Sequence, residues 1–207
     1  MPFFAAAITC IVSYLLGGIN GAIIVSTVFL REDIRTKGSG NAGLTNMYRS
    51  FGMRAAVMTL VIDVLKAAIG ILIGWLWIGH VTGFPLMGKL IAGLLVMLGH
   101  AFPVWYGLKG GKGALVCGVV ALMVDWRVGL ICIAFFIVVV IISSYVSAGS
   151  ILSGAIVFPL FTRVFGATNQ EFLLAALCGV LIVIMHIPNI GRIIMGKENK
   201  FHLQRKR

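Results

Sequence analysis

The sequence predicts an all-α polytopic membrane protein, and three observations support that fold class. Hydrophobic residues make up 60% of the 207 residues and charged residues 11%, whereas about a quarter of the residues in a soluble domain are charged. The apolar residues gather into runs, several of which reach the roughly 20 residues that a bilayer-spanning helix needs. The formal net charge of +11 lies mainly between these runs and near the C-terminal end. We therefore expect one integral membrane domain over residues 1–207, a bundle of about seven transmembrane helices, some of them short.

The first three spans are expected at residues 3–30, 55–79 and 86–105. Small residues in the first of them favour close helix packing. The polar loop at residues 31–54 carries five basic residues. Because cytoplasmic loops are enriched in lysine and arginine, we expect this loop inside and the N-terminus outside.

The second half of the chain has shorter apolar runs. Residues 114–124 would form a helix about 16 Å long, too short for a hydrocarbon core of roughly 30 Å, so we expect the loop before it to lie below the membrane surface. Residues 128–143 lead to a neutral polar stretch at 143–150, which we expect as a cytoplasmic loop. Residues 151–165 and 171–195 complete the bundle, and alternation places the C-terminus and its basic tail in the cytoplasm. Five or six full spans are the alternative count.

The second predicted span contains two charged residues, Asp63 and Lys66. Their i,i+3 spacing places them on one helical face. A lone charge at mid-membrane costs about 2.5–3.5 kcal/mol on insertion scales, so we expect the two to pair and to face the bundle. We interpret the pair as structural support first and as part of a polar pocket second.

Two glycine-rich polar stretches lie next to apolar runs. GHAFPVWYGLKGGKG at residues 99–113 brings glycines together with Lys109 and Lys112. Glycine lets consecutive backbone N–H groups turn toward one point, which predicts a phosphate cradle at the membrane surface. A basic turn shaped by the positive-inside bias is the alternative. GSGNAGLTNMYR at residues 38–49 has the same character and favours the cradle.

Several function classes lack their signals in this sequence. The four cysteines are scattered through apolar segments, and no His, Cys and Asp cluster has metal-ligand spacing. No nucleophile elbow, Walker A sequence or nucleic-acid-reading module occurs. We therefore expect no metal, no cofactor and no nucleic acid partner. What remains is an anion site at a membrane surface, suited to a reaction that needs little more than anion binding.

Three stretches together resemble one known family. GSGNAGLTNMYR, GHAFPVWYGLKGGKG and HIPNIGRIIMGKENK look like the three motifs, in order and spacing, of the bacterial membrane acyl-phosphate:glycerol-3-phosphate acyltransferases. The resemblance covers essentially the whole chain. It implies a seven-helix bundle that transfers a fatty acyl group from acyl phosphate to the 1-position of glycerol 3-phosphate, giving lysophosphatidic acid and phosphate in the first acylation step of phospholipid biosynthesis.

The resemblance also implies a location and partners. The protein is expected as a multi-pass protein of the bacterial inner membrane, with its active site facing the cytoplasm. Acyl phosphate and glycerol 3-phosphate are the expected substrates and the lipid bilayer the surroundings. A soluble enzyme that forms acyl phosphate is a candidate partner.

The family's functional residues can be carried over to matching positions. The expected catalytic residues are Ser39, Arg49, Lys112, His186 and Asn189. The expected substrate- and phosphate-binding residues are Asn41, Thr45, Asn46, Lys109, Gly110, Gly111, Gly113 and Ser147. His100 and Glu198 are expected as structural support, beside the Asp63 and Lys66 pair. For the first motif the alternative is a set of cap residues and a positive-inside arginine.

The third motif pairs His186 with Asn189 at i,i+3, so that on one helix face the two side chains could position glycerol phosphate. The alternative for His186 is an interfacial histidine that is satisfied at a helix end. Glu198 is interpreted as an ion-pair anchor and not as a base.

Four positions depart from the family pattern: Leu44, Leu108, Val116 and Ile187. The first three are apolar and could alter acyl-chain fit or loop packing. A basic residue commonly occupies the position of Ile187, and its loss weakens the case for phosphate binding there. Arg192 is close enough in sequence to substitute for it.

A small polytopic anion transporter is the rival interpretation, because broken helices and glycine loops at membrane depth also occur in carriers. A carrier needs polar groups that are reachable from both faces. The predicted outer turns, HVTGFP, DWR and GATNQ, offer few such groups, and no inverted repeat is visible. A lipid-binding scaffold without catalysis is a third interpretation.

Overall fold

The computed structural model describes residues 2–201, and its regular elements are all helical in that part of the chain. The predicted all-α fold class is confirmed. In the first half the elements are α1 (Pro2–Gly17), α2 (Gly21–Ile24), α3 (Leu44–Gly74), α4 (His80–Thr82) and α5 (Pro85–Ala101). In the second half they are α6 (Ala114–Val124), α7 (Trp126–Ser143), α8 (Val146–Leu152), α9 (Phe158–Val164), α10 (Asn169–Met185) and α11 (Ile187–Ile194). Residues 202–207 of the predicted basic tail lie outside the described residues.

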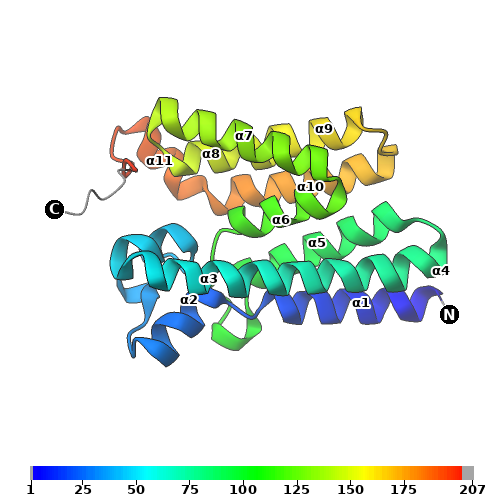
Figure 1. Ribbon diagram of the computed structural model, residues 1–207, viewed down its shortest axis with the longest axis horizontal. Coiled ribbons are helices and arrows are strands. Elements are labelled where there is room, and N and C mark those ends of the chain that lie inside the picture. Colours follow the sequence, from blue (N-terminus) through cyan, green and yellow to red (C-terminus); the bar gives the residue numbers. More distant parts are fainter. Residues whose placement is uncertain (1, 202–207) are drawn as a thin grey trace.

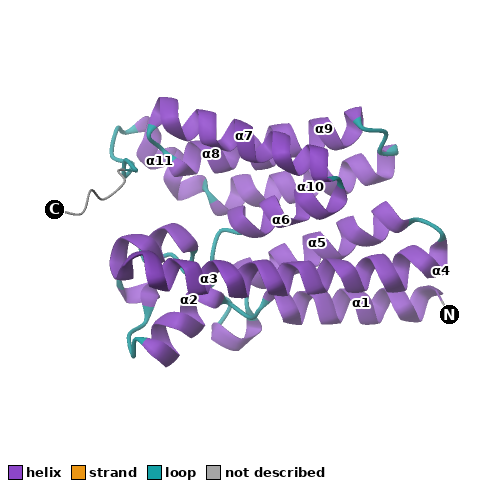
Figure 2. Cartoon of the chain, in the orientation of Figure 1, coloured by secondary structure: helices purple, strands orange, loops and turns teal. Residues whose placement is uncertain are grey.

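Several α-helices continue into short π-helical turns. These turns are Val25–Phe29 after α2, Trp75–Gly79 after α3 and Ser153–Val157 between α8 and α9. Single 3₁₀ turns occur at Ile34–Thr36 and Val104–Tyr106. Short loops make the remaining connections (Figure 2).

Five stretches of the described chain are long and apolar enough to cross a membrane. They are Ala6–Phe29, Leu44–Thr82, Pro85–Tyr106, Trp126–Ser143 and Val146–Val164. A sixth results if α10 and α11, which meet at a bend of 57°, count as one span. α6 is the seventh apolar helix and has 11 residues, which is too short to span, as the sequence predicts.

The helices form two groups with a cavity between them. α1, α3 and α5 lie together in one group, α7 to α10 lie in the other, and α6 lies between the groups (Figure 1). α6 packs against α3, α5 and α7, and α10 also contacts α5, so the two groups are joined along their length. The main apolar core lies where α5, α6 and α10 meet, with Val96 and Met97 of α5, Val116 and Val120 of α6 and Ile182 of α10 fully buried.

The helix that contains the second span begins earlier than the sequence predicts. α3 starts at Leu44, so half of the first motif is helical, and Asn46 ties the preceding loop to it by accepting from the Ser39 N–H at 3.0 Å. Gly52 interrupts the helix with φ 81° and ψ −171°, a conformation essentially restricted to glycine. The motif helix therefore meets the membrane-spanning part of α3 at a break.

The predicted loop at residues 143–150 is wrong in its conformation, because most of this stretch is helical. The chain breaks there at Ser144 and Tyr145, and α8 begins at Val146. The polar side chains of Ser143 and Ser150 bond to carbonyls of their own helices, at 2.7 Å and 2.9 Å. Because these hydroxyls are satisfied within a helix, the polar stretch needs no surrounding water.

The predicted span at residues 171–195 is bent. α10 ends at Met185, His186 forms the junction, and Pro188 lies in the first turn of α11. Proline cannot donate a backbone hydrogen bond and clashes with the preceding turn, so the helix cannot continue straight. The sequence predicts that His186 and Asn189 share the face of one straight helix. This prediction is wrong, because His186 lies at the bend and Asn189 lies beyond it in α11.

Candidate functional site

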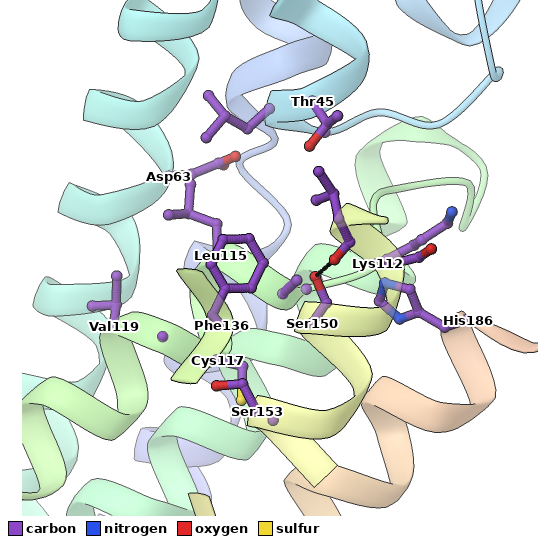
Figure 3. Close-up of a pocket in the computed structure, with 18 of the residues that line it drawn as sticks. Thr45, Asp63, Lys112, Leu115, Cys117, Val119, Phe136, Ser150, Ser153 and His186 are labelled. Carbon is purple, nitrogen blue, oxygen red and sulfur yellow. Dashed lines mark hydrogen bonds between the residues drawn. The ribbon is translucent and has the colours of Figure 1, made fainter. Parts of the chain in front are cut away.

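A cavity of about 710 Å³ opens between the two groups of helices. Its walls come from the loop before α3, the start and middle of α3, the loop before α6, α6 itself, α7, α8, α11 and the segment after α11. One end is polar, with Lys112 and His186, and the other is apolar, with Phe136 and Val119 (Figure 3). The polar lining consists of Ser39, Asn41, Thr45, Asn46, Arg49, Asp63, His100, Lys112, Ser147, Ser150, Ser153, His186, Asn189, Arg192, Glu198 and Asn199.

All five expected catalytic residues line this one cavity. Ser39 lies in the loop before α3, Arg49 on α3, Lys112 before α6, and His186 and Asn189 at the α10–α11 bend. They come from positions up to 150 residues apart in sequence, as the hydrogen bond from Arg49 to the backbone carbonyl of Asn199 (3.4 Å) illustrates. The fold thus brings the three sequence motifs to one end of one cavity.

A chain of hydrogen bonds connects Lys112 to Glu198 through Asn189. The Lys112 ammonium donates to the Asn189 amide oxygen at 2.5 Å, and the Asn189 amide nitrogen donates to the Glu198 carboxylate at 2.6 Å. Ser147 donates to the same carboxylate oxygen at 2.8 Å, and Arg192 donates to the other at 2.8 Å. Glu198 is therefore an anchor for three side chains of the cavity wall, as the sequence predicts.

The polar end carries a surplus of positive charge. Arg49, Lys112 and Arg192 face it. The carboxylates among the described lining residues are Asp63, which pairs with Lys66, and Glu198, which pairs with Arg192. Burial lowers the pKa of Lys112 to about 8, the positive charges of Arg192 and Arg49 lower it as well, and Glu198 raises it. Burial raises the pKa of Glu198, but the hydrogen bonds from Asn189, Ser147 and Arg192 outweigh this, so its pKa lies below the usual value. Glu198 stays ionised, and the remaining positive charge suits an anion.

The glycine-lysine loop differs from the predicted nest. The Gly110 N–H donates to the carbonyl of Ala101 at 3.2 Å and the Gly111 N–H to that of His100 at 3.0 Å. These two N–H groups bind the end of α5 and do not turn toward a shared anion. Lys109 is exposed, and neither it nor the two glycines line the cavity.

The start of α6 takes the place of the predicted nest. Gly113 precedes the helix in a left-handed conformation (φ 78°), and Gly113, Ala114 and Leu115 all line the cavity beside Lys112. The first N–H groups of a helix have no helical acceptor and carry partial positive charge, which favours an anion. The loop therefore combines one lysine with one helix N-terminus.

The first motif contributes both lining and scaffold residues. Ser39, Asn41, Thr45 and Arg49 line the polar end. Asn46 lines it too, but its side chain is 3% exposed, and its amide nitrogen donates to the carbonyls of Lys37 and Asn41, at 3.0 Å each. Asn46 therefore shapes the loop that carries Ser39.

His186 has a defined orientation in the wall. Its Nδ1 lies 2.8 Å from the carbonyl oxygen of Ile182. Because a carbonyl can only accept, Nδ1 carries the proton in the neutral ring and Nε2 keeps its lone pair. The neutral His186 side chain can therefore accept a hydrogen bond through Nε2.

Asp63 and Lys66 are paired inside the bundle, as the sequence predicts. The Lys66 ammonium lies 2.8 Å from Asp63 Oδ1, donates to His100 Nδ1 at 2.8 Å and donates to the carbonyl of Ile19 at 2.6 Å. Asp63 also accepts from the Gly21 N–H at 3.1 Å. The pair thus connects α3, α5 and the break between α1 and α2, and Asp63 and His100 also line the cavity.

The departures from the motif pattern have different placements. Leu44 lines the cavity, Val116 is fully buried in the core, and Leu108 is exposed. Ile187 is 59% exposed and does not line the cavity, whereas Arg192, one turn further along α11, does. Arg192 is therefore placed where it can supply the charge that Ile187 lacks.

Sequence reasoning missed the apolar arm of the cavity. It is lined mainly by α6 and α7, with Leu115, Gly118, Val119, Leu122, Met123, Ile133, Phe136 and Ile137. Ser150, Ser153 and Asn199 were also missed. The spacing of Leu115, Gly118 and Leu122 on one helical face was the available signal. In residues 2–201 no group of three or more His, Cys, Asp or Glu side chains is placed to hold a metal ion.

Comparisons with known proteins agree on one family. The family model described as glycerol-3-phosphate acyltransferase matches residues 7–196. A glycerol-3-phosphate acyltransferase of Thermoanaerobacter pseudethanolicus is 38% identical over 195 residues, covering 94% of this chain and 95% of its own. One from Clostridioides difficile is 39% identical over 201 residues, covering 97% of each chain.

Solved structures show the same architecture. A crystal structure of PlsY (YgiH), an integral membrane glycerol 3-phosphate acyltransferase in its glycerol 3-phosphate form, matches with a TM-score of 0.85 and 33% identity, covering 95% of this chain and 96% of that one. The lysophosphatidic acid form of the same protein matches with a TM-score of 0.83 and 32% identity, covering 95% of each chain.

Proposed function

Because the chain belongs to the glycerol-3-phosphate acyltransferase family, we propose that it transfers a fatty acyl group from acyl phosphate to the sn-1 hydroxyl of glycerol 3-phosphate. The products are 1-acyl-glycerol 3-phosphate, which is lysophosphatidic acid, and inorganic phosphate. This multi-pass membrane enzyme then catalyses the first acylation step of phospholipid biosynthesis.

The observation that carries the proposal is the two-part cavity. Its polar end holds Arg49, Lys112 and Arg192 against the single carboxylate of Glu198, and its other end is apolar. An acyl phosphate has the same two parts, a phosphate and a hydrocarbon chain. A second phosphate, on glycerol, needs further cations, and the three basic side chains supply them.

The roles that the resemblance implies are supported by the placement of these side chains in one cavity. Lys112 and the start of α6 hold the phosphate of the donor. Ser39 and Arg49 of the first motif line the same cavity, and His186 and Asn189 position glycerol 3-phosphate. Glu198 keeps Asn189, Ser147 and Arg192 in place.

The chemistry needs no covalent enzyme intermediate. Acyl phosphate is a mixed anhydride, so the glycerol hydroxyl oxygen forms a bond to the acyl carbon while the bond from that carbon to the phosphate oxygen breaks. Holding the two anions in register contributes about 7–11 kcal/mol when the geometry is good, and the cationic groups stabilise the departing phosphate. The proton of the hydroxyl goes to an oxygen of that phosphate, which leaves as inorganic phosphate.

His186 is the alternative proton acceptor, through Nε2. The two routes differ in the pH profile of His186→Asn. If the departing phosphate is the base, turnover falls but the profile keeps its shape. Loss of one limb of the profile in this variant would assign the base to His186 and overturn the phosphate route.

We place the enzyme in the bacterial inner membrane with the cavity mouth toward the cytoplasm. The exposed basic residues Arg31, Lys37, Arg54, Lys197 and Lys200 support this, because they lie on segments at the cavity's polar end and cytoplasmic segments are enriched in such residues. A soluble enzyme that forms acyl phosphate is the candidate partner at this face.

The test is a turnover assay with the protein purified in detergent. Phosphate release from palmitoyl phosphate is measured with and without glycerol 3-phosphate, and palmitoyl-CoA is the comparison donor. We expect release that depends on the acceptor and a product acylated at sn-1. Transfer from palmitoyl-CoA alone would contradict the proposal that acyl phosphate is the donor. An sn-2 product would contradict the proposed sn-1 position of acylation. No transfer from either donor would contradict the function and favour the transporter interpretation.

A further inference from the structure

The wall of the apolar arm has a gap in the middle of α6. Leu115, Gly118 and Leu122 follow one another at three- and four-residue spacing, so they lie on one helical face, and all three line the cavity. Leu115 and Leu122 carry large side chains into this wall. Gly118, between them, carries none.

Helix packing does not account for this glycine. A Cβ built on Gly93 would meet the side chain of Val120 at 2.8 Å, and one on Gly149 would meet Val140 at 2.8 Å, so those glycines allow close contact between helices. A Cβ built on Gly118 meets no heavy atom of the described neighbours within 4 Å. Glycine also lowers helix stability relative to alanine. The space beside Gly118 is therefore space in the cavity.

Gly118 lies part of the way along the arm. It is four residues from Ala114 at the start of α6, which corresponds to about 6 Å along the helix axis. An extended hydrocarbon chain advances about 1.3 Å per carbon, given C–C bonds of about 1.5 Å. With the acyl carbon beside Lys112, roughly the fifth or sixth carbon then passes Gly118. Ile133 and Phe136 of α7 also line the arm.

We propose that Gly118 determines which acyl-chain lengths the enzyme accepts, by leaving a gap in the α6 wall through which the chain passes beyond about its sixth carbon. The substrate class is a long-chain acyl donor, and this inference rests on the proposed acyl transfer. Shorter chains end before the gap and make no contact with it. A side chain at position 118 would occupy the path of longer chains.

The experiment compares Gly118→Ala and Gly118→Phe with a matched control. Ala134→Phe adds the same ring to an exposed position on α7 that does not line the cavity. Butyryl, octanoyl and palmitoyl phosphate are used as donors, and kcat/KM of each variant is divided by that of the wild type for each donor. This ratio removes differences in how the donors partition into detergent.

We expect Gly118→Phe to lower kcat/KM for the palmitoyl donor by at least about tenfold. Each buried methylene of the acyl chain contributes about fourfold to binding, and the phenyl ring would displace several methylenes from the cavity. For butyryl phosphate, kcat/KM of Gly118→Phe should stay within about twofold of the wild-type value. Gly118→Ala should give an intermediate loss with the palmitoyl donor, and Ala134→Phe should match the wild type with all donors. Equal losses for all chain lengths would show a structural role and overturn the proposal, as would no loss with palmitoyl phosphate.

The wild-type reactions separate this inference from the proposed function. If wild-type protein transfers no acyl group from acyl phosphate but does so from acyl-CoA, the proposed donor fails. The same chain-length series is then run with acyl-CoA donors. A length-dependent loss in Gly118→Phe supports the role of Gly118 with either donor, and a length-independent result overturns it with either donor.

Discussion

The amide group of Asn189 holds Lys112 at the polar end of the cavity and connects it to the carboxylate of Glu198. Its oxygen accepts from the Lys112 ammonium at 2.5 Å, and its nitrogen donates to Glu198 at 2.6 Å. Lys112 precedes α6, Asn189 lies in α11, and Glu198 follows α11. The lysine of the second motif is therefore oriented by two residues of the third, and the predictions below concern this relationship and its surroundings.

Replacing Lys112 should abolish most of the turnover without unfolding the protein. We expect Lys112→Ala to lower kcat by about 100- to 1,000-fold, the range measured when one preorganised donor to a developing anion is removed. Lys197→Ala is the matched control, because Lys197 is exposed and does not line the cavity. Equal turnover in the two variants would contradict the role of Lys112.

The pH dependence should report the ionisation of Lys112. A lysine is charged below its pKa, and the pKa of Lys112 is lowered from 10.5 to about 8, mainly by burial. The positive charge of Lys112, which we propose binds phosphate, is therefore lost as the pH rises through about 8. We expect kcat/KM for the acyl phosphate donor to fall above that pH, and the basic limb of Lys112→Arg to lie well above it, because arginine stays protonated. An unchanged basic limb in Lys112→Arg would contradict this assignment.

Removing the charge of Glu198 should move the same limb in the other direction. Glu198 raises the pKa of Lys112, so without its charge the pKa of Lys112 falls below about 8. Glu198→Gln should therefore lose activity at a lower pH than the wild type does. The KM for glycerol 3-phosphate should also rise, since Arg192 loses its ionic partner. A basic limb that moves to higher pH would refute the coupling.

The break in α3 should matter for substrate binding. Gly52 has φ 81° and ψ −171°, and a Cβ there would meet no neighbour within 4 Å, so any effect of Gly52→Ala comes from the backbone. Such a conformation costs a non-glycine residue on the order of 1–3 kcal/mol. We expect the variant to realign the motif helix and raise the KM for glycerol 3-phosphate, because Thr45 and Arg49 move with it.

Gly83→Ala is the control for this experiment. Gly83 also has a positive φ of 76° with no neighbour within 4 Å, but it lies in the turn between α4 and α5 and does not line the cavity. Both variants should lose stability, and the rise in KM should appear for Gly52→Ala alone. A similar rise in KM for both would attribute the effect to general strain.

The buried pair should contribute to stability. Asp63 and Lys66 are 1% and 3% exposed, so replacing one partner leaves the other charge buried without compensation. We expect Asp63→Leu or Lys66→Met to lower the free energy of unfolding in detergent by about 3–5 kcal/mol. The double variant should lose less than the sum of the two single losses, since no charge remains unpaired. Strict additivity would show that the pair does not act as a unit.

Much of the fold follows from local composition. The apolar runs at residues 55–79 and 86–105 lie within the spans Leu44–Thr82 and Pro85–Tyr106. The eleven-residue α6 appears where residues 114–124 predict a helix too short to span. The breaks were harder to predict, because Gly52 and the serines near residue 144 act through backbone conformation and through bonds within their own helices, which hydropathy does not record.

The sequence by itself determined the membrane class, the approximate spans, the three motifs and the pairing of Asp63 with Lys66. These depend on composition and on spacing within one segment. Only the tertiary structure decided that Asn189 bridges Lys112 and Glu198, that Gly110 and Gly111 bind the end of α5, and that an apolar arm extends from the polar end. The physical reason is that hydrogen bonds and cavities depend on distances between segments far apart in the chain, and hydropathy and motif spacing contain no such distances.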